Sequence, residues 1–320
     1  MESKKATPTY SYPNSTKPNT NVCESSTPFR KLKRVKPAKL PPPCGVKFPT
    51  TAKTVCCDVV TPFCQADERY LFTSAYSILC QVGANVTLHV VADGFEPSDE
   101  TKRLAEEFEN LKLYRNEKVL GPYLSVMRIF HNFKTDFFAI QDADDYSLPH
   151  RIWHAVTTLQ RTGYDLFGAT AQQNLAPSKN HTEWVLKRAY RDSYHRSGVV
   201  WDSAPLGMCV HPVSVFRKSS FESINGYADF VSGADCEINT RGRVAGWECF
   251  ITPAIHGVRT LRSESLSNGL EFGDDTTYRK WLVGELERRY SIYASGNVDP
   301  KEYGALERTQ NETHKTKRIV

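Results

Sequence analysis

The spacing of apolar positions changes repeatedly along residues 54–141 of this chain. Short runs rich in β-branched and aromatic residues predict buried strands, whereas apolar residues three or four positions apart predict amphipathic helices. The predicted strands cover 54–60, 86–92, 111–114 and 136–141, and the predicted helices cover 66–82, a segment after the capping residue Ser98, and 123–133. Strands that alternate with helices at this spacing indicate an α/β fold with a mostly parallel sheet, which binds ligands at the carboxyl ends of its strands.

The two ends of the chain lack this pattern. Residues 1–54 are rich in Thr, Pro, Ser, Asn and Lys, and they predict a disordered basic arm. Residues 1–55 hold eleven lysines and arginines against two acidic residues, a net charge of +9. Because the whole chain has a net charge of +5, the remaining residues have a net charge of −4. The basic run 29–39 is either a solvated tail or an attachment site for DNA or another polyanion. Near the other end, 278–293 has helical spacing and 296–320 predicts a loose polar tail.

Composition excludes several classes of protein. With 40% hydrophobic residues the chain has enough apolar material for a sizeable core. No apolar run reaches the length of a membrane span, and the N-terminus lacks the apolar region of a secretory signal, so we expect no transmembrane segment. The nine cysteines are odd in number and include no Cys-x-x-Cys, which favours a reducing, cytoplasmic location.

The strongest chemical signal is an acidic cluster that follows the predicted strand 136–141. Asp142, Asp144 and Asp145 place three carboxylates within four residues, where they repel one another unless a cation neutralises them. Hard cations such as Mg²⁺ use one or two such carboxylates together with phosphate oxygens. The cluster therefore predicts a metal–diphosphate site, and the alternative is an acidic turn that caps a helix near Pro149.

Several segments in the same order resemble the motifs of family-2 glycosyltransferases, which have the Rossmann-like GT-A fold. The matching segments are Val59-Val-Thr-Pro-Phe63, Ser77-Ile-Leu-Cys-Gln81, Val90-Val-Ala-Asp93-Gly94, Asp142-Ala-Asp144-Asp145, Val215–Tyr227, Gly233-Ala-Asp235-Cys-Glu237 and Arg262–Ser267. The resemblance covers about 55–270, which predicts one GT-A domain there and a C-terminal helical extension and loose tail at 271–320. It departs from the family at Ala92, where an Asp is usual, and at Ile129, where an Asn is usual.

The resemblance implies metal-dependent transfer of a sugar from a nucleotide diphosphate, preferably a UDP-sugar, to an acceptor hydroxyl with inversion. The metal would be Mn²⁺ or Mg²⁺, with Asp144 as the main ligand and Asp145 and His256 as further candidates. The implied donor-binding residues are Asp93 for the base, Asp142 for the ribose or a metal-bound water, Arg128 on a helix near the nucleotide, and Arg259 and Arg262 for the diphosphate. Asp235 is the expected general base and Glu237 the reserve.

Each of these roles has a structural alternative. Asp235 could cap a helix that begins near Ile238, and Glu237 could be a first-turn acid favoured by the helix dipole. His256 could be a structural hydrogen-bonding residue, and Arg259 and Arg262 could be surface charges. The aromatic residues of 165–211 could either stack on an acceptor or belong to the core.

The acceptor divides the functional hypotheses. One acceptor class is a glycan or small saccharide, and the other is a hydroxymethylated DNA base, which the basic arm would help to hold. A nucleotidyltransferase is less favoured, because the segment after the first strand, Thr61–Ala66, lacks a glycine-rich basic loop. The acids Asp142, Asp144, Asp145 and Asp235 argue against a non-catalytic binding module.

Overall fold

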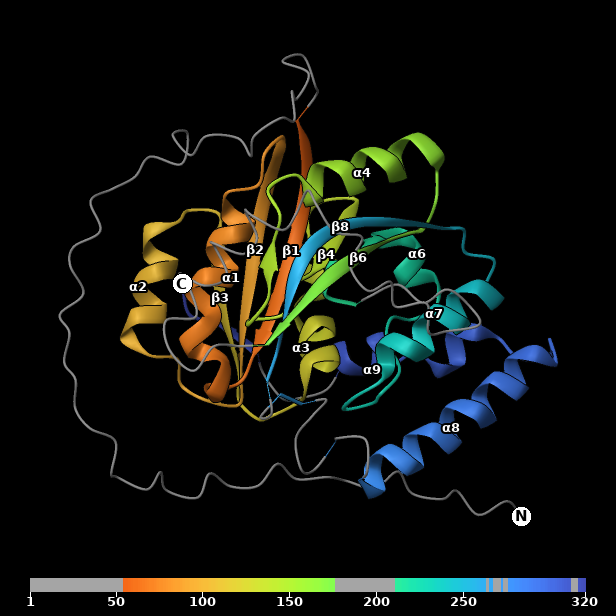
Figure 1. Ribbon diagram of the computed structural model, residues 1–320. Helices are drawn as coiled ribbons and strands as arrows, with labels where there is room; N and C mark the ends of the chain where they lie inside the picture. Colours follow the sequence, from red (N-terminus) through yellow and green to blue (C-terminus); the bar gives the residue numbers. More distant parts are fainter. Residues whose placement is uncertain (1–53, 176–210, 263–264, 267–271, 273–275, 312–315) are drawn as a thin grey trace. The chain divides into compact units, whose positions relative to one another are not determined.

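Four parallel strands form the centre of the fold. The computed structural model describes residues 54–175, 211–262, 265–266, 272, 276–311 and 316–320, and the predicted arm 1–54 therefore lies almost entirely outside the described residues. The central strands are β1 (Val55–Phe63), β2 (Ala84–Asp93), β3 (Leu111–Asn116) and β4 (Phe137–Ile140), in the order β4-β1-β2-β3. All three of their pairings are parallel, which confirms the predicted sheet (Figure 1).

Further strands extend this sheet on both sides. They are β5 (Tyr146–Ser147), β6 (Leu166–Leu175), β7 (Val215–Arg217), β8 (Cys249–Leu261) and β9 (Thr316–Arg318). The full order among the described residues is β5-β8-β6-β7-β4-β1-β2-β3-β9. β7 pairs antiparallel with β4 and β6, whereas β6 and β8 are parallel, so the second half of the sheet is mixed. The polar segment 296–320 was predicted to be loose, and this was wrong in part, because β9 pairs with β3 and forms the edge of the sheet.

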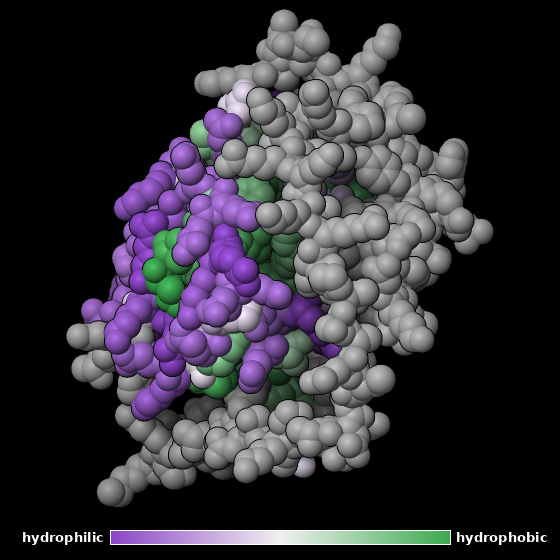
Figure 2. All heavy atoms as spheres, turned by 90° about the vertical axis from the view of Figure 1, so that its left-hand side faces the viewer, coloured by the Kyte–Doolittle hydropathy of each residue, from purple (hydrophilic) through white to green (hydrophobic). Residues whose placement is uncertain are grey.

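Helices pack on both faces of the sheet because the strands bury side chains on both sides. On one face α1 (Glu68–Leu79), α2 (Asp99–Glu107) and α4 (Arg151–Thr162) share a core with β1 and β2. On the other face α3 (Pro122–Ile129) and α6 (Lys218–Ser223) meet a group of aromatic rings, among them Phe130, Phe138 and Phe221. The predicted cap of α2 is confirmed, since the Ser98 hydroxyl accepts a hydrogen bond from the Thr101 N–H at 3.3 Å. The side of α2 is mostly hydrophilic (Figure 2).

The C-terminal part of the chain packs against the body. α7 (Ala234–Val244) contacts α8 (Thr277–Ala294), which contains the predicted helix 278–293. The turn η5 (Pro300–Tyr303) and α9 (Leu306–Asn311) come next, and α9 contacts α3. In the part of the chain that the structure describes, no helix is long and apolar enough to cross a membrane.

Candidate active site

Acidic residues from separate elements meet at one edge of the sheet, because the carboxyl ends of β1, β2 and β4 lie together there. Asp67 lies in η2 (Gln65–Asp67) just after β1, Asp93 ends β2, and Asp142, Asp144 and Asp145 follow β4. The parallel register that aligns these ends comes from the pairing of β1 with β2 and β4.

The acidic loop after β4 is held from below by buried side chains. Gln141 is fully buried, and its amide donates to the carbonyl oxygens of Asp142 and Asp145 at 3.2 and 3.0 Å. The Arg151 guanidinium, also fully buried, donates to Gln141 Oε1 at 2.7 Å and to the Ile140 carbonyl at 2.6 Å. These bonds fix the loop backbone, so the carboxylates have little freedom to move apart.

The crowded carboxylates raise one another's pKa. Burial, then the charge of Asp144 and more weakly those of Asp235 and Asp67, raise the pKa of Asp142 to about 7, against the opposing charge of Arg259. The pKa of Asp144 is also raised, by burial and by Asp67, although Arg262 acts in the opposite direction. Such mutual repulsion is what a bound cation relieves.

Asp145 has a different environment from the other two carboxylates of the loop. Its Oδ1 accepts a hydrogen bond from the Thr260 N–H of β8 at 2.8 Å. Burial and the charges of Asp144 and Asp142 raise its pKa well above the usual range. The side chain therefore joins the loop to β8, which sets it apart from Asp142 and Asp144.

The two arginines at the end of β8 face the acids. Arg262 Nε donates to Asp144 Oδ2 at 2.7 Å, a second nitrogen pairs with Asp67, and the guanidinium lies over the Tyr70 ring. The charge of Arg259 acts on both Asp142 and Asp145. The alternative that these two arginines are surface charges is wrong for Arg262, which is 6% exposed.

Asp235 approaches the acidic loop from α7. Its charge acts on Asp142, and its Oδ1 accepts a 2.7 Å hydrogen bond from the Tyr123 hydroxyl of α3. The alternative that Asp235 caps the helix is wrong, because the N-cap is Gly233 and Asp235 lies in the first turn. Asp235 is partly exposed.

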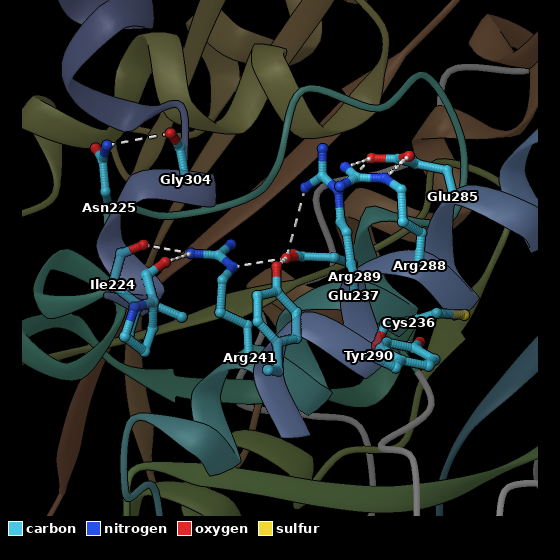
Figure 3. A network of polar contacts seen from close by, with 12 residues as sticks. Ile224, Asn225, Cys236, Glu237, Arg241, Glu285, Arg288, Arg289, Tyr290 and Gly304 are labelled. Atoms are coloured by element: carbon cyan, nitrogen blue, oxygen red, sulfur yellow. Dashed lines mark hydrogen bonds and ion pairs between the residues drawn. The ribbon is translucent and has the colours of Figure 1, made fainter. Parts of the chain in front are cut away.

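Glu237 does not share this position, and the expectation of a reserve base there is not supported by the geometry. Its side chain is fully buried, and Oε1 accepts from Arg241 Nε at 2.8 Å and from the Tyr293 hydroxyl at 2.5 Å. Arg289 of α8 lies 3.7 Å from the same oxygen (Figure 3). Glu237 therefore joins α7 to α8, which favours the alternative that it is a structural acid in the first turn of α7.

The carboxylate of Asp93 is hydrogen-bonded to the backbone at the start of α3. Its carboxylate accepts from the N–H groups of Leu120 and Gly121 at 2.9 and 2.8 Å, and from the side chains of Asn116 and Ser125. Gly121 has φ +85°, a conformation that favours glycine, and it caps α3. Four donors of the chain thus occupy most of the acceptor positions of the Asp93 carboxylate. The prediction that Asp93 binds the base of the nucleotide did not include these bonds.

His256 and Arg128 are both buried, on β8 and α3 respectively. His256 is fully buried, its Nε2 lies 3.0 Å from His154 Nδ1, and its ring meets those of His150 and Phe167. The structure therefore groups His256 with histidines rather than with Asp144, which favours the structural alternative. Arg128 is 5% exposed.

Among the described residues, no three His, Cys, Asp or Glu side chains are arranged to hold a metal ion by themselves. The acids nevertheless suit Mg²⁺ or Mn²⁺. The carboxylates of Asp142 and Asp144 are hard oxygen donors that lie close together, and their pKa values are raised. Such ions take their other ligands from phosphate and water.

This arrangement of strands and acids is that of a known family. The sequence model of "Glycosyl transferase family 2" matches residues 58–224, more than half of the chain. The chain belongs to this family. It is a glycosyltransferase, as the motifs predicted, and the matched region contains most of β1 and all of β2, β3, β4 and the acidic loop.

Solved structures show the same fold at low sequence identity. A crystal structure of residues 1–349 of S. aureus TarS in complex with UDP-GlcNAc has a TM-score of 0.56 and 13% identity, and the match covers 79% of this chain and 70% of that chain. TarS 1–349 in complex with UDP has a TM-score of 0.50 and 14% identity, with 75% and 73% covered. This likeness confirms the GT-A fold. No curated protein sequence matches this glycosyltransferase significantly.

Several residues at this edge of the sheet are not among those predicted from the sequence. Asp67 could have been found, since it follows the first strand as the other acids follow theirs. Tyr123, Gln141 and Arg151 gave no separate signal, because their partners lie in other elements. Most of the aromatic stretch 165–211 lies outside the described residues, but His211 is described and stacks edge-on against Tyr123.

Proposed function

We propose that this glycosyltransferase moves a sugar from a UDP-sugar to an acceptor hydroxyl, with inversion at the anomeric carbon and with Mn²⁺ or Mg²⁺. The observation that carries the proposal is the position of Asp235. It is a partly exposed carboxylate from α7, close enough for its charge to act on Asp142 of the acidic loop. A single displacement needs one such base on the face opposite the leaving group.

In this proposal Asp144 holds the cation and Asp142 lies beside it on the donor side. The bound cation supplies Lewis-acid stabilisation of the negative charge that develops on the diphosphate. Arg259 and Arg262 add positive charge at the same place, and a guanidinium suits two-pronged bonds to phosphate oxygens. Asp145 accepts a hydrogen bond from the Thr260 N–H, and in this proposal it anchors β8 and does not bind the metal.

The chemistry then follows from position. The acceptor oxygen attacks the anomeric carbon, the bond from that carbon to the diphosphate oxygen breaks, and Asp235 takes the hydroxyl proton. The TarS complexes with UDP-GlcNAc and UDP support a UDP-sugar as the donor. We favour a glycan or small saccharide as the acceptor, with hydroxymethylated DNA as the alternative that the net charge of +9 in residues 1–55 motivates.

The test is release of UDP from a panel of UDP-sugars with Mn²⁺, with Mg²⁺ or with a chelator, each with saccharide acceptors or hydroxymethylated DNA. We expect release that depends on metal and falls by about 10²- to 10³-fold in Asp144→Ala. Asp99→Asn, at an exposed acid of α2, is the matched control and should retain full activity.

The product's anomeric configuration, read by NMR, tests inversion. Equal release by the wild type and Asp144→Ala would contradict the metal assignment. Stimulation by DNA alone would replace the saccharide acceptor with the nucleic-acid alternative.

A further inference from the structure

The hydroxyl of Tyr123 donates a hydrogen bond to the carboxylate of Asp235. Tyr123 lies in the first turn of α3, and Asp235 lies in the first turn of α7, more than a hundred residues later. Asp235 Oδ1 accepts a 2.7 Å hydrogen bond from the Tyr123 hydroxyl. Among the described residues, no other group donates to Oδ1 and none donates to Oδ2. Tyr123 thus engages one oxygen of the carboxylate, and no residue that the structure describes donates a hydrogen bond to the other.

The tyrosine is itself held in place. It is 7% exposed, and its ring packs against those of His211 and Tyr227 at centroid distances of 5.3 and 5.1 Å. His211 Nε2 lies 2.9 Å from the Tyr227 hydroxyl, which ties these two rings together. Asp93 fixes the start of α3 by binding the N–H of Gly121, two residues before Tyr123. The hydroxyl therefore has little freedom to swing away from Asp235.

The hydroxyl also stays protonated. Burial, followed by the charge of Asp235, raises the pKa of Tyr123 well above the usual range. At neutral pH Tyr123 is thus a neutral group, and its hydroxyl donates to Asp235.

We propose that Tyr123 is a positioning residue, which orients the Asp235 carboxylate by holding Oδ1 so that Oδ2 faces the acceptor hydroxyl. This inference rests on the proposed role of Asp235 as the base. A base oriented by a third group is a common arrangement in enzymes that activate a hydroxyl. Misplacement of a reacting group by about 1 Å costs about 10²-fold in rate, so loss of this one bond has a measurable effect.

The experiment uses the full-length chain with Tyr123→Phe, Asp235→Asn and the double variant, and it measures kcat and KM for transfer together with UDP binding by calorimetry. We expect Tyr123→Phe to lower kcat by about 10- to 100-fold while UDP affinity and the KM for the donor change by less than about twofold. Asp235→Asn should lower kcat by about 10²- to 10⁴-fold. The double variant should be no slower than Asp235→Asn, because the hydroxyl acts only through the carboxylate.

The matched control is Tyr290→Phe. The Tyr290 hydroxyl, on α8, donates to the carbonyl of Cys236 at 3.3 Å, so it touches the same helix without touching the Asp235 carboxylate. It should keep wild-type kcat, and thermal melting of each variant checks that it is folded.

The outcomes separate the two proposals. If Asp235→Asn keeps its activity, Asp235 is not the base and the proposed function fails at that residue. If Asp235→Asn is inactive but Tyr123→Phe is as fast as the wild type, the positioning role is overturned. A double variant slower than Asp235→Asn, or an equal loss in Tyr290→Phe, would show that Tyr123 only supports the fold.

Discussion

The buried position of Asp142 beside Asp144 carries a cost to stability. Its pKa in the folded chain is about 7, raised by burial and then by Asp144, whereas an unfolded aspartate titrates at about 3.9. A raised pKa means that the folded state binds more protons than the unfolded state between these values. Stability from this group is therefore complete below about pH 4 and is lost as pH rises through about 7.

We accordingly predict that Asp142→Asn stabilises the metal-free protein while it abolishes transfer. In a chelator, its melting temperature should exceed that of the wild type by a few degrees near pH 8, and the difference should shrink near pH 5. Added Mn²⁺ should raise the melting temperature of the wild type more than that of the variant, which keeps Asp144 but lacks the neighbouring carboxylate. Differential scanning fluorimetry measures this, with exposed Asp99→Asn as control, and a pH-independent difference would contradict the electrostatic origin.

The sequence predicted Asp93 and the acidic loop 142–145 because these acids follow strands and strand ends are local features, whereas Asp235 and Glu237 came from the family resemblance. The resemblance ranked Asp235 ahead of Glu237 as the base, but the sequence could not predict the surroundings of either acid. Asp235 and Glu237 are two positions apart in one helical turn, yet one meets Tyr123 and the other meets Arg241 and Tyr293. Tyr123 and Tyr293 come from other elements, so only the packed structure shows how the surroundings of the two acids differ.

At the scale of elements, the buried network around Glu237 joins α7 to its neighbours. Arg241 pairs with Glu237 and donates to the carbonyl oxygens of Ile224 and Gly226, and Glu285 holds Arg289 at 2.8 Å beside the pair (Figure 3). Removing one partner of a buried ion pair leaves the other charge uncompensated, which is strongly destabilising. The network thus fixes the helix that carries Asp235.

This gives opposite predictions for two neighbouring acids. Glu237→Gln should lower the free energy of unfolding by about 3 kcal/mol or more, with kcat per folded molecule within a few-fold of wild type. Asp235→Asn should leave the free energy of unfolding nearly unchanged and remove turnover. Urea denaturation and kcat measured on the same samples test both, and a stable but inactive Glu237→Gln would return that residue to the catalytic candidates.

At the scale of the whole molecule, the sequence located the α/β body but left most of its C-terminal part unpredicted. Periodicity revealed α8, whereas η5, α9 and β9 are too short to leave a period, and their order comes from contacts. The Tyr278 hydroxyl bonds the Ser232 backbone, Asn225 bonds the Gly304 carbonyl, and the Ile319 N–H donates to Leu113 of β3. Residues after 271 therefore complete the body that the predicted boundary at 270 would divide.

We predict that a chain of residues 54–320 folds and melts cooperatively, whereas residues 54–270 do not. The shorter chain loses the α8 partners of Glu237 and leaves the Gly233 turn, against which Leu282 packs, exposed to water. It also leaves β3 as an open edge, which promotes aggregation. Circular dichroism melting and size-exclusion chromatography distinguish the two chains. A sharp transition in 54–270, with UDP binding retained, would establish 271–320 as a dispensable extension and limit the active site to the strands, α3 and α7.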